Sequence, residues 1–245
     1  MEVRRLEPGD EAALADFTTV WLAADRAEWP DLGTFGLNDF RAFVAHEGTV
    51  KRFHLLAASP PGGPTAGVAL MEVPLRDNLH SAELVAVMVH PERRRRGGGT
   101  ALVDSAAELA HADRRHVLNS IVDVPLGTAS THPSVGFALA MGFQPTLGGN
   151  KRVLRVPLRP ELRAELRAVV AGGPGADRYR VFTFRTPWPV EYAEDHCELA
   201  RRMSTDEPAG DGDHESHLYA TALSKTFHPP PRRPPLERIS LLSPL

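Results

Sequence analysis

The chain has 245 residues, one cysteine, and 28 basic against 31 acidic residues, for a formal net charge of −3. The length suits one full domain and a smaller second unit. A single cysteine excludes a disulfide framework, and the absence of an apolar segment after Met1 favours a cytoplasmic protein without a secretory signal. No stretch has membrane-spanning length, and a net negative chain gives no general attraction to nucleic acid, so neither is expected as a partner.

The first part of the chain alternates between strand and helix patterns. In chain order the pattern predicts a strand at 3–6, a helix from about 11 that Pro30 ends, a helix at 38–46, strands at 52–58, 66–73 and 83–89, a helix of about four turns from 100, a strand at 116–124, a helix from 133 to 141, and a strand at 152–158. This order predicts an α/β or α+β domain over residues 1–159.

The remaining residues divide into three segments. Residues 160–176 are predicted to be a helical linker ending in the hinge "GGPG". Residues 177–205, with a strand predicted at 179–185 and a helix at 189–203, repeat the plan of the first strand and helix, which indicates a partial second repeat. Residues 206–245 are rich in proline and lack periodicity, so a disordered tail is predicted and the second copy is interpreted as truncated.

One motif carries the strongest chemical signal. The stretch "HPERRRRGGGT", residues 90–100, follows a predicted strand and opens a predicted helix. Glycines before a helix let backbone N–H groups and the positive end of the helix approach one anion, which suits a phosphate or pyrophosphate. A Walker A loop would need Gly-Lys-Ser/Thr, and a dinucleotide fingerprint would need a glycine at Leu102. The pattern that remains is Arg94-x-x-Gly97-x-Gly99.

This pattern resembles motif A of the GNAT superfamily, the acyl-CoA-dependent N-acyltransferases. The "MGF" that closes the helix predicted from 133 resembles the "xGF" of the same family. The resemblance covers residues 3–158. The partial second repeat at 177–205 makes the chain similar to tandem GNAT proteins of the mycothiol synthase type. It implies a mixed, mostly antiparallel central sheet with helices on both faces.

The resemblance also implies a site for acetyl-CoA as co-substrate. The backbone of Val87, Met88 and Val89 would pair with the pantetheine arm. The pyrophosphate would lie on the loop formed by Arg94, Arg95, Arg96, Gly97, Gly98, Gly99 and Thr100. A solvated basic turn or a nucleic-acid patch is the alternative reading of the arginines at 93–96.

Acyl transfer to an amine needs a base, an N–H donor for the oxyanion and, in many enzymes, an acid. Glu83 is the candidate base, because it begins the strand that leads into the motif and would share a face with Val85, Val87 and Val89 by two-residue alternation. A strand-end carboxylate in water is the alternative.

The family's usual acid tyrosine is replaced here by Ala138, and Thr131 stands where many members carry asparagine. A thiolate leaves near neutral pH with limited acid help, so this difference does not exclude turnover. His80 and His132 are loop residues that are candidates for an acid or for substrate contacts. The histidines show no metal-ligand spacing with Cys197, so no metal is predicted.

Two functions follow from these residues. The first is an N-acetyltransferase that moves an acetyl group from acetyl-CoA to a primary amine of a small molecule or a protein. The alternative is a non-catalytic acyl-CoA-binding or scaffolding half of a tandem GNAT protein. The sequence indicates neither the acceptor nor the oligomeric state.

Overall fold

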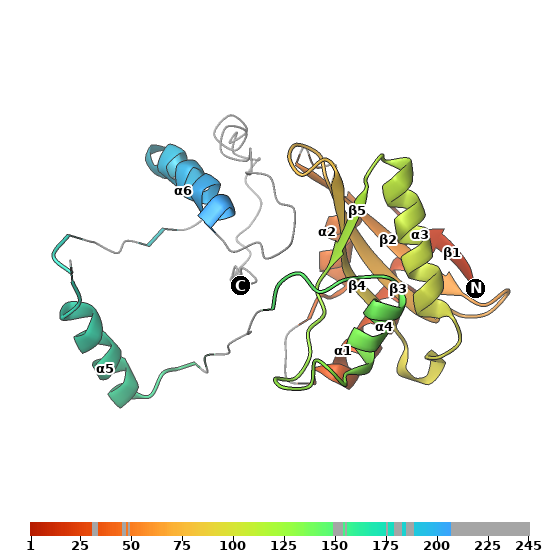
Figure 1. Cartoon of the computed structure of the whole chain (residues 1–245), viewed down its shortest axis with the longest axis horizontal. Helices are drawn as coiled ribbons and strands as arrows, with labels where there is room; N and C mark the ends of the chain where they lie inside the picture. Colours follow the sequence, from red (N-terminus) through yellow and green to blue (C-terminus); the bar gives the residue numbers. More distant parts are fainter. Residues whose placement is uncertain are drawn as a thin grey trace.

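The computed structural model describes residues 1–30, 34–45, 48, 50–148, 154, 156–174, 176–178, 183–184 and 189–206. Its strands are β1 (Glu2–Arg5), β2 (Lys51–Ser59), β3 (Gly67–Pro74), β4 (Ser81–Val89) and β5 (Val117–Ser120). Its α-helices are α1 (Glu11–Glu28), α2 (Leu37–Ala45), α3 (Gly98–Ala112), α4 (Pro133–Ala140), α5 (Pro160–Ala171) and α6 (Ala193–Asp206), with short 3-10 turns η1 (Pro91–Arg93) and η2 (Val190–Tyr192). Figure 1 shows their arrangement.

The strands form one mixed sheet in sequence order, β1-β2-β3-β4-β5. Neighbouring strands from β1 to β4 pair in antiparallel fashion, whereas β4 and β5 pair in parallel. The parallel pair requires a crossover, which α3 supplies. The predicted mixed, mostly antiparallel sheet is thus confirmed.

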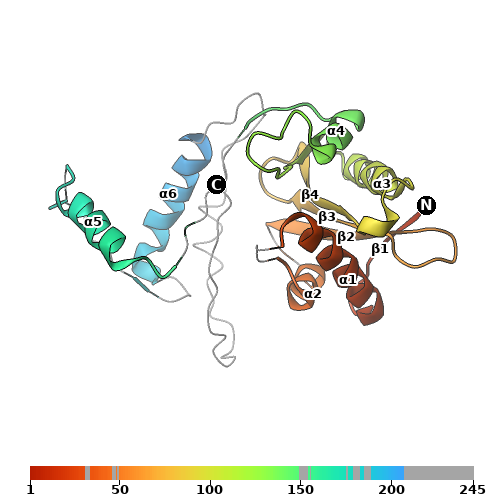
Figure 2. The same cartoon turned by 90° about the horizontal axis from the view of Figure 1, so that it is seen from below.

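Helices cover both faces of this sheet, as predicted (Figure 2). On one face α1 and α2 bury a cluster rich in aromatic rings, with Phe17, Trp21 and Phe40 at its centre. On the other face α3 buries a cluster that includes Leu56, Met71 and Leu102. Strand residues alternate between the two clusters, so the sheet itself is the middle layer of the unit.

Local capping signals define the helix ends. Asp10 accepts a hydrogen bond from the Ala13 N–H at 3.0 Å and so caps the start of α1. At the end of α4, Gly142 takes a left-handed φ of 88° and the Phe143 N–H bonds back to the Ala138 carbonyl at 3.1 Å. Phe143 then packs against the α3 cluster.

The strand predicted at 116–124 is longer than β5, which ends at Ser120. Pairing with β4 ends at Leu84 opposite Ser120, and residues 121–124 leave the sheet. Ile121 is 65 % exposed, so this apolar run has no packing partner in the described part of the chain that would hold it in a strand. A strand was also predicted at 152–158. Residues 154 and 156–158 lie outside any strand, and the other positions of that range lie outside the described residues.

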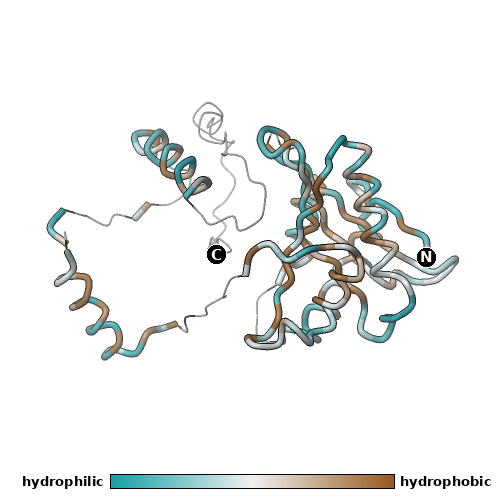
Figure 3. Tube along the Cα trace, viewed as in Figure 1, coloured by the Kyte–Doolittle hydropathy of each residue, from teal (hydrophilic) through white to brown (hydrophobic). Residues whose placement is uncertain are grey.

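The two predicted helices beyond the sheet are confirmed as α5 and as η2 followed by α6. Figure 3 shows hydrophobic and hydrophilic residues alternating around α5. Its apolar residues Leu166, Val169 and Val170 are exposed. Most of the strand predicted at 179–185 and all of the tail from residue 207 lie outside the described residues.

Candidate acyl-CoA and acceptor site

A bulge in β4 sets the geometry of the site. Leu70 pairs with Ala86 and Met71 with Leu84, so Val85 is an extra residue on β4. Val85 packs on the α1 face, whereas Val87 packs on the α3 face. The extra residue reverses the alternation, so the prediction that Glu83 shares a face with Val87 and Val89 is wrong. Of the three valines, only Val85 shares the α1 face with Glu83.

Glu83 belongs to a polar row across this face. Its register partners are Glu72 on β3 and Asn119 on β5. Glu72 is bound by Lys51, whose Nζ lies 2.9 Å from each carboxylate oxygen. Glu83 is partly buried. The row therefore brings two carboxylates, a lysine and an amide to the end of the sheet where β4 and β5 are still paired.

Beyond Leu84 and Ser120, the edge of β4 that faces β5 is no longer paired with it. The His90 N–H donates to the Ala66 carbonyl on the β3 side, at 3.0 Å. Because the backbone groups of successive strand residues point to opposite edges, those of Val87 and Val89 point toward the open edge. The backbone of Met88 points to β3. Of the three predicted pantetheine contacts, only Val87 and Val89 thus have backbone groups directed to this edge, and the Val89 carbonyl there accepts from Arg94 Nε.

This open edge leads into the loop before α3. η1 is followed by Arg95 with φ of 62° and by Gly97 with φ of 83°, the N-cap of α3. The N-cap provides no side-chain hydrogen bond, so the N–H groups of the first turn, at Gly98, Gly99 and Thr100, are not capped. Uncapped N–H groups together with the positive helix end are an anion-binding arrangement.

The three glycines differ in their surroundings. A Cβ at Gly97 would meet nothing within 4 Å, but its positive φ disfavours side chains. A Cβ at Gly99 would lie 3.1 Å from the tip of the Phe137 ring on α4. Gly99 therefore permits close packing of α3 on α4, a role that the motif pattern alone does not reveal.

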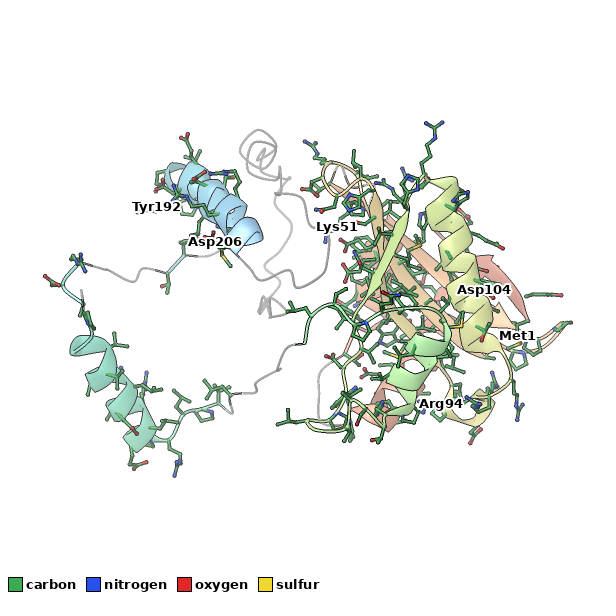
Figure 4. All side chains as sticks on the ribbon, in the orientation of Figure 1. Met1, Lys51, Arg94, Asp104, Tyr192 and Asp206 are labelled. Carbon is green, nitrogen blue, oxygen red and sulfur yellow. The ribbon has the colours of Figure 1, made fainter. Side chains whose placement is uncertain are left out.

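The arginines of the loop are not equivalent. Arg94 binds Glu28 of α1, with Nη1 2.7 Å from Oε1, and its Nε lies 3.3 Å from the Val89 carbonyl oxygen. Arg93 donates to the Thr65 carbonyl. Arg95 and Arg96 are exposed. Figure 4 marks Arg94 at the lower edge of the sheet unit and Lys51 near its upper edge.

The remaining predicted positions have structural roles. The His132 Nδ1 accepts from the Ser134 N–H at 3.3 Å and so caps α4. The carbonyl of His80 accepts from the His116 N–H at 2.7 Å. Thr131 bonds to the Thr128 carbonyl. Ala138 is partly buried on α4. None of these contacts supplies an acid in place of the tyrosine.

A cavity of about 360 Å³ lies at the other edge of the sheet, beside β1 and β2. His54 lines it and is 8 % exposed. Burial, and then the nearby charges of Arg5 and Arg52, lower the pKa of His54. None of the motif residues lines this cavity.

Two further findings concern metals and membranes. Within the described ranges, no group of three or more His, Cys, Asp or Glu side chains is placed to hold a metal ion. No helix of the described part of the chain is long and apolar enough to cross a membrane.

Comparison with solved structures finds similar proteins. A tandem GNAT protein from the clavulanic acid biosynthesis pathway is 26 % identical, with a TM-score of 0.50 over 58 % of this chain and 43 % of that chain. An aminoglycoside acetyltransferase from an uncultured soil metagenomic sample, in complex with sisomicin, is 11 % identical with a TM-score of 0.48, covering 63 % of this chain and 96 % of that one. AAC(6')-Iy in complex with the bisubstrate analog CoA-S-monomethyl-acetylneamine is 17 % identical with a TM-score of 0.42, covering 64 % and 97 %.

The chain thus spans less than half the length of the tandem protein. A comparison with curated proteins finds no match. The model of the acetyltransferase (GNAT) family matches residues 15–143, which run from α1 through the loop before α3 to Phe143. The chain therefore belongs to the GNAT acetyltransferase family, whose members carry out acyl transfer.

Proposed function

We propose that this protein transfers an acetyl group from acetyl-CoA to a primary amine of a small molecule or a protein. The observation that carries the proposal is the open β4 edge, which connects the carboxylate row at Glu83 with the uncapped start of α3. The acceptor amine would bind near Glu83, and acetyl-CoA would bind along the edge toward the start of α3. Residues 1–159 are the proposed catalytic unit, and a cytoplasmic setting stays a prediction.

The donor would bind along the edge and at the helix. The amides of the pantetheine arm pair with the backbone groups of Val87 and Val89, as an added strand would. The pyrophosphate accepts hydrogen bonds from the N–H groups of Gly98, Gly99 and Thr100, where the helix dipole also favours negative charge. The exposed Arg95 and Arg96 add positive charge beside the loop.

The chemical steps follow from this placement. Glu83 accepts a proton from the ammonium group of the acceptor, and the free amine then attacks the thioester carbonyl carbon. The carbonyl oxygen becomes an oxyanion, for which an edge N–H of β4 is the donor. The tetrahedral intermediate breaks its C–S bond, so the electron pair leaves with the CoA thiolate, and the nitrogen loses its second proton to water. A thiol pKa of about 8.5 makes the thiolate a tolerable leaving group without a tyrosine.

The replacement of the acid tyrosine by Ala138 favours the second candidate, a non-catalytic acyl-CoA-binding half of a tandem protein. Both candidates bind the donor and differ only in turnover. α5 lies in segment 160–176, which we predict to be a linker. α6 begins in segment 177–205, which we predict to be a partial second repeat, and ends at Asp206. No acceptor is assigned to either segment.

The test combines two measurements on the full chain. Thiol release from acetyl-CoA is followed across a panel of primary amines, while calorimetry measures the affinity for CoA. The proposal predicts CoA binding together with amine-dependent thiol release. Binding without release for any amine would favour the non-catalytic candidate, and absence of binding would contradict both.

A further inference from the structure

The guanidinium group of Arg94 is held at two points in this structure. Its Nη1 lies 2.7 Å from Oε1 of Glu28, the last residue of α1, and its Nε lies 3.3 Å from the Val89 carbonyl oxygen. The ion-paired side chains are 42 % and 34 % exposed. Arg94, the first residue of the loop at 94–100, is therefore joined to the end of α1 and to the end of β4, where the open edge meets the loop.

These contacts involve two groups that a bound donor would use, the Val89 carbonyl and the Arg94 guanidinium. The Val89 carbonyl is one of the outward-facing groups of the β4 edge, and Arg94 is the first residue of the loop that would hold the pyrophosphate. The Glu28 carboxylate also places a negative charge beside that loop. An anion that binds there gains a guanidinium only if Arg94 exchanges the carboxylate for phosphate oxygens.

On the basis of the proposed function, we infer that Glu28 is a positioning residue that opposes donor binding by holding Arg94 away from the pyrophosphate. An exposed ion pair is weak, so the pyrophosphate displaces Glu28 when the donor binds. Glu28 is the last residue of α1, so its release would break the ion pair that joins the end of this helix to the loop before α3.

A double-mutant cycle tests the inference. Calorimetry measures CoA affinity for the parent, Glu28→Gln, Arg94→Met and the double variant at low and moderate salt. Glu28→Gln should bind CoA about two- to fivefold more tightly, which is the range that an exposed ion pair supports. The gain should shrink as salt rises, because salt screens the pair. In the Arg94→Met background the same change should have less than about a 1.5-fold effect.

Glu92→Gln is the matched control, because Glu92 is an exposed carboxylate of the same loop on η1. It should leave CoA affinity unchanged within about 1.5-fold. A weaker CoA affinity in Glu28→Gln would contradict the inference that Glu28 opposes donor binding. An equal gain in CoA affinity in the parent and Arg94→Met backgrounds would also contradict it. Either result would leave the proposed donor site intact. Absence of CoA binding in the parent and in Glu28→Gln would overturn the donor site, and the role of Glu28 with it.

Discussion

Glu83 lies directly opposite Glu72 across the β3–β4 ladder, one register step before the ladder shifts at Val85. Opposed like charges destabilise a sheet, so a pair of this kind needs compensation. Lys51 provides it for Glu72 through two contacts of 2.9 Å. Glu72 is thus held by a lysine, and Glu83 lies on the strand that borders the open edge.

Glu83→Gln should lower the amine-dependent kcat/KM by about 10²- to 10⁴-fold near neutral pH, because the amide cannot accept the proton. CoA affinity should stay the same. The rate should recover in part at high pH, since an amine with a pKa near 10 then supplies its own free base. Pre-steady-state thiol release across pH measures this. Glu72→Gln is the control on the same face, and an equal loss in both variants would contradict the assignment of the base.

Arg115 should be a stability determinant of the β3–β4 connection. Its guanidinium donates to the carbonyls of Pro74, at 2.8 Å, and Leu79. Arg115→Met leaves both acceptors without this donor and should lower the free energy of unfolding by about 1.5–3 kcal/mol. Arg114→Gln at the neighbouring, exposed position is the control and should stay within about 0.5 kcal/mol. Equal losses in urea unfolding would rule out this anchoring role.

His54 should make the free energy of unfolding of the sheet unit decrease as the pH falls. Burial lowers the pKa of His54 below its ordinary value of 6.5, so the folded state resists protonation. The unfolded chain gains a proton first as the pH falls, and the stability present above about pH 6.5 is lost progressively down to the folded pKa. Thermal unfolding between pH 8 and pH 5 should show a smaller acid loss in His54→Leu than in the parent. His116→Gln, an exposed control, should follow the parent curve.

Much of the fold could be predicted because its signals are local. Asp10 caps α1, Pro133 starts α4 and Gly142 ends it, and each of these residues works through contacts within a few positions of itself. Strand alternation likewise predicted β2, β3 and β4. The loop before α3 could be identified for the same reason, since strand, glycines and helix follow one another directly.

The parts that were missed depend on pairs of distant segments. The bulge at Val85 exists only relative to β3, and no residue type at this position predicts it. It places Glu83 and Val87 on opposite faces, and it lies one residue beyond Leu84, the last β4 residue that pairs with β5. The contacts of Gly99 with Phe137 and of Arg94 with Glu28 join elements far apart in the chain, so spacing within a motif cannot reveal them.

The measurement that tests the donor site most directly is CoA binding by Thr100→Glu. Thr100 is exposed in the first turn of α3, where a carboxylate suits the helix dipole, so folding and thermal stability should be retained. The same carboxylate would occupy the site proposed for the pyrophosphate and should weaken CoA binding by at least about tenfold, whereas Thr100→Gln should bind within about threefold of the parent. A folded Thr100→Glu variant with parental CoA affinity would contradict the donor site at α3.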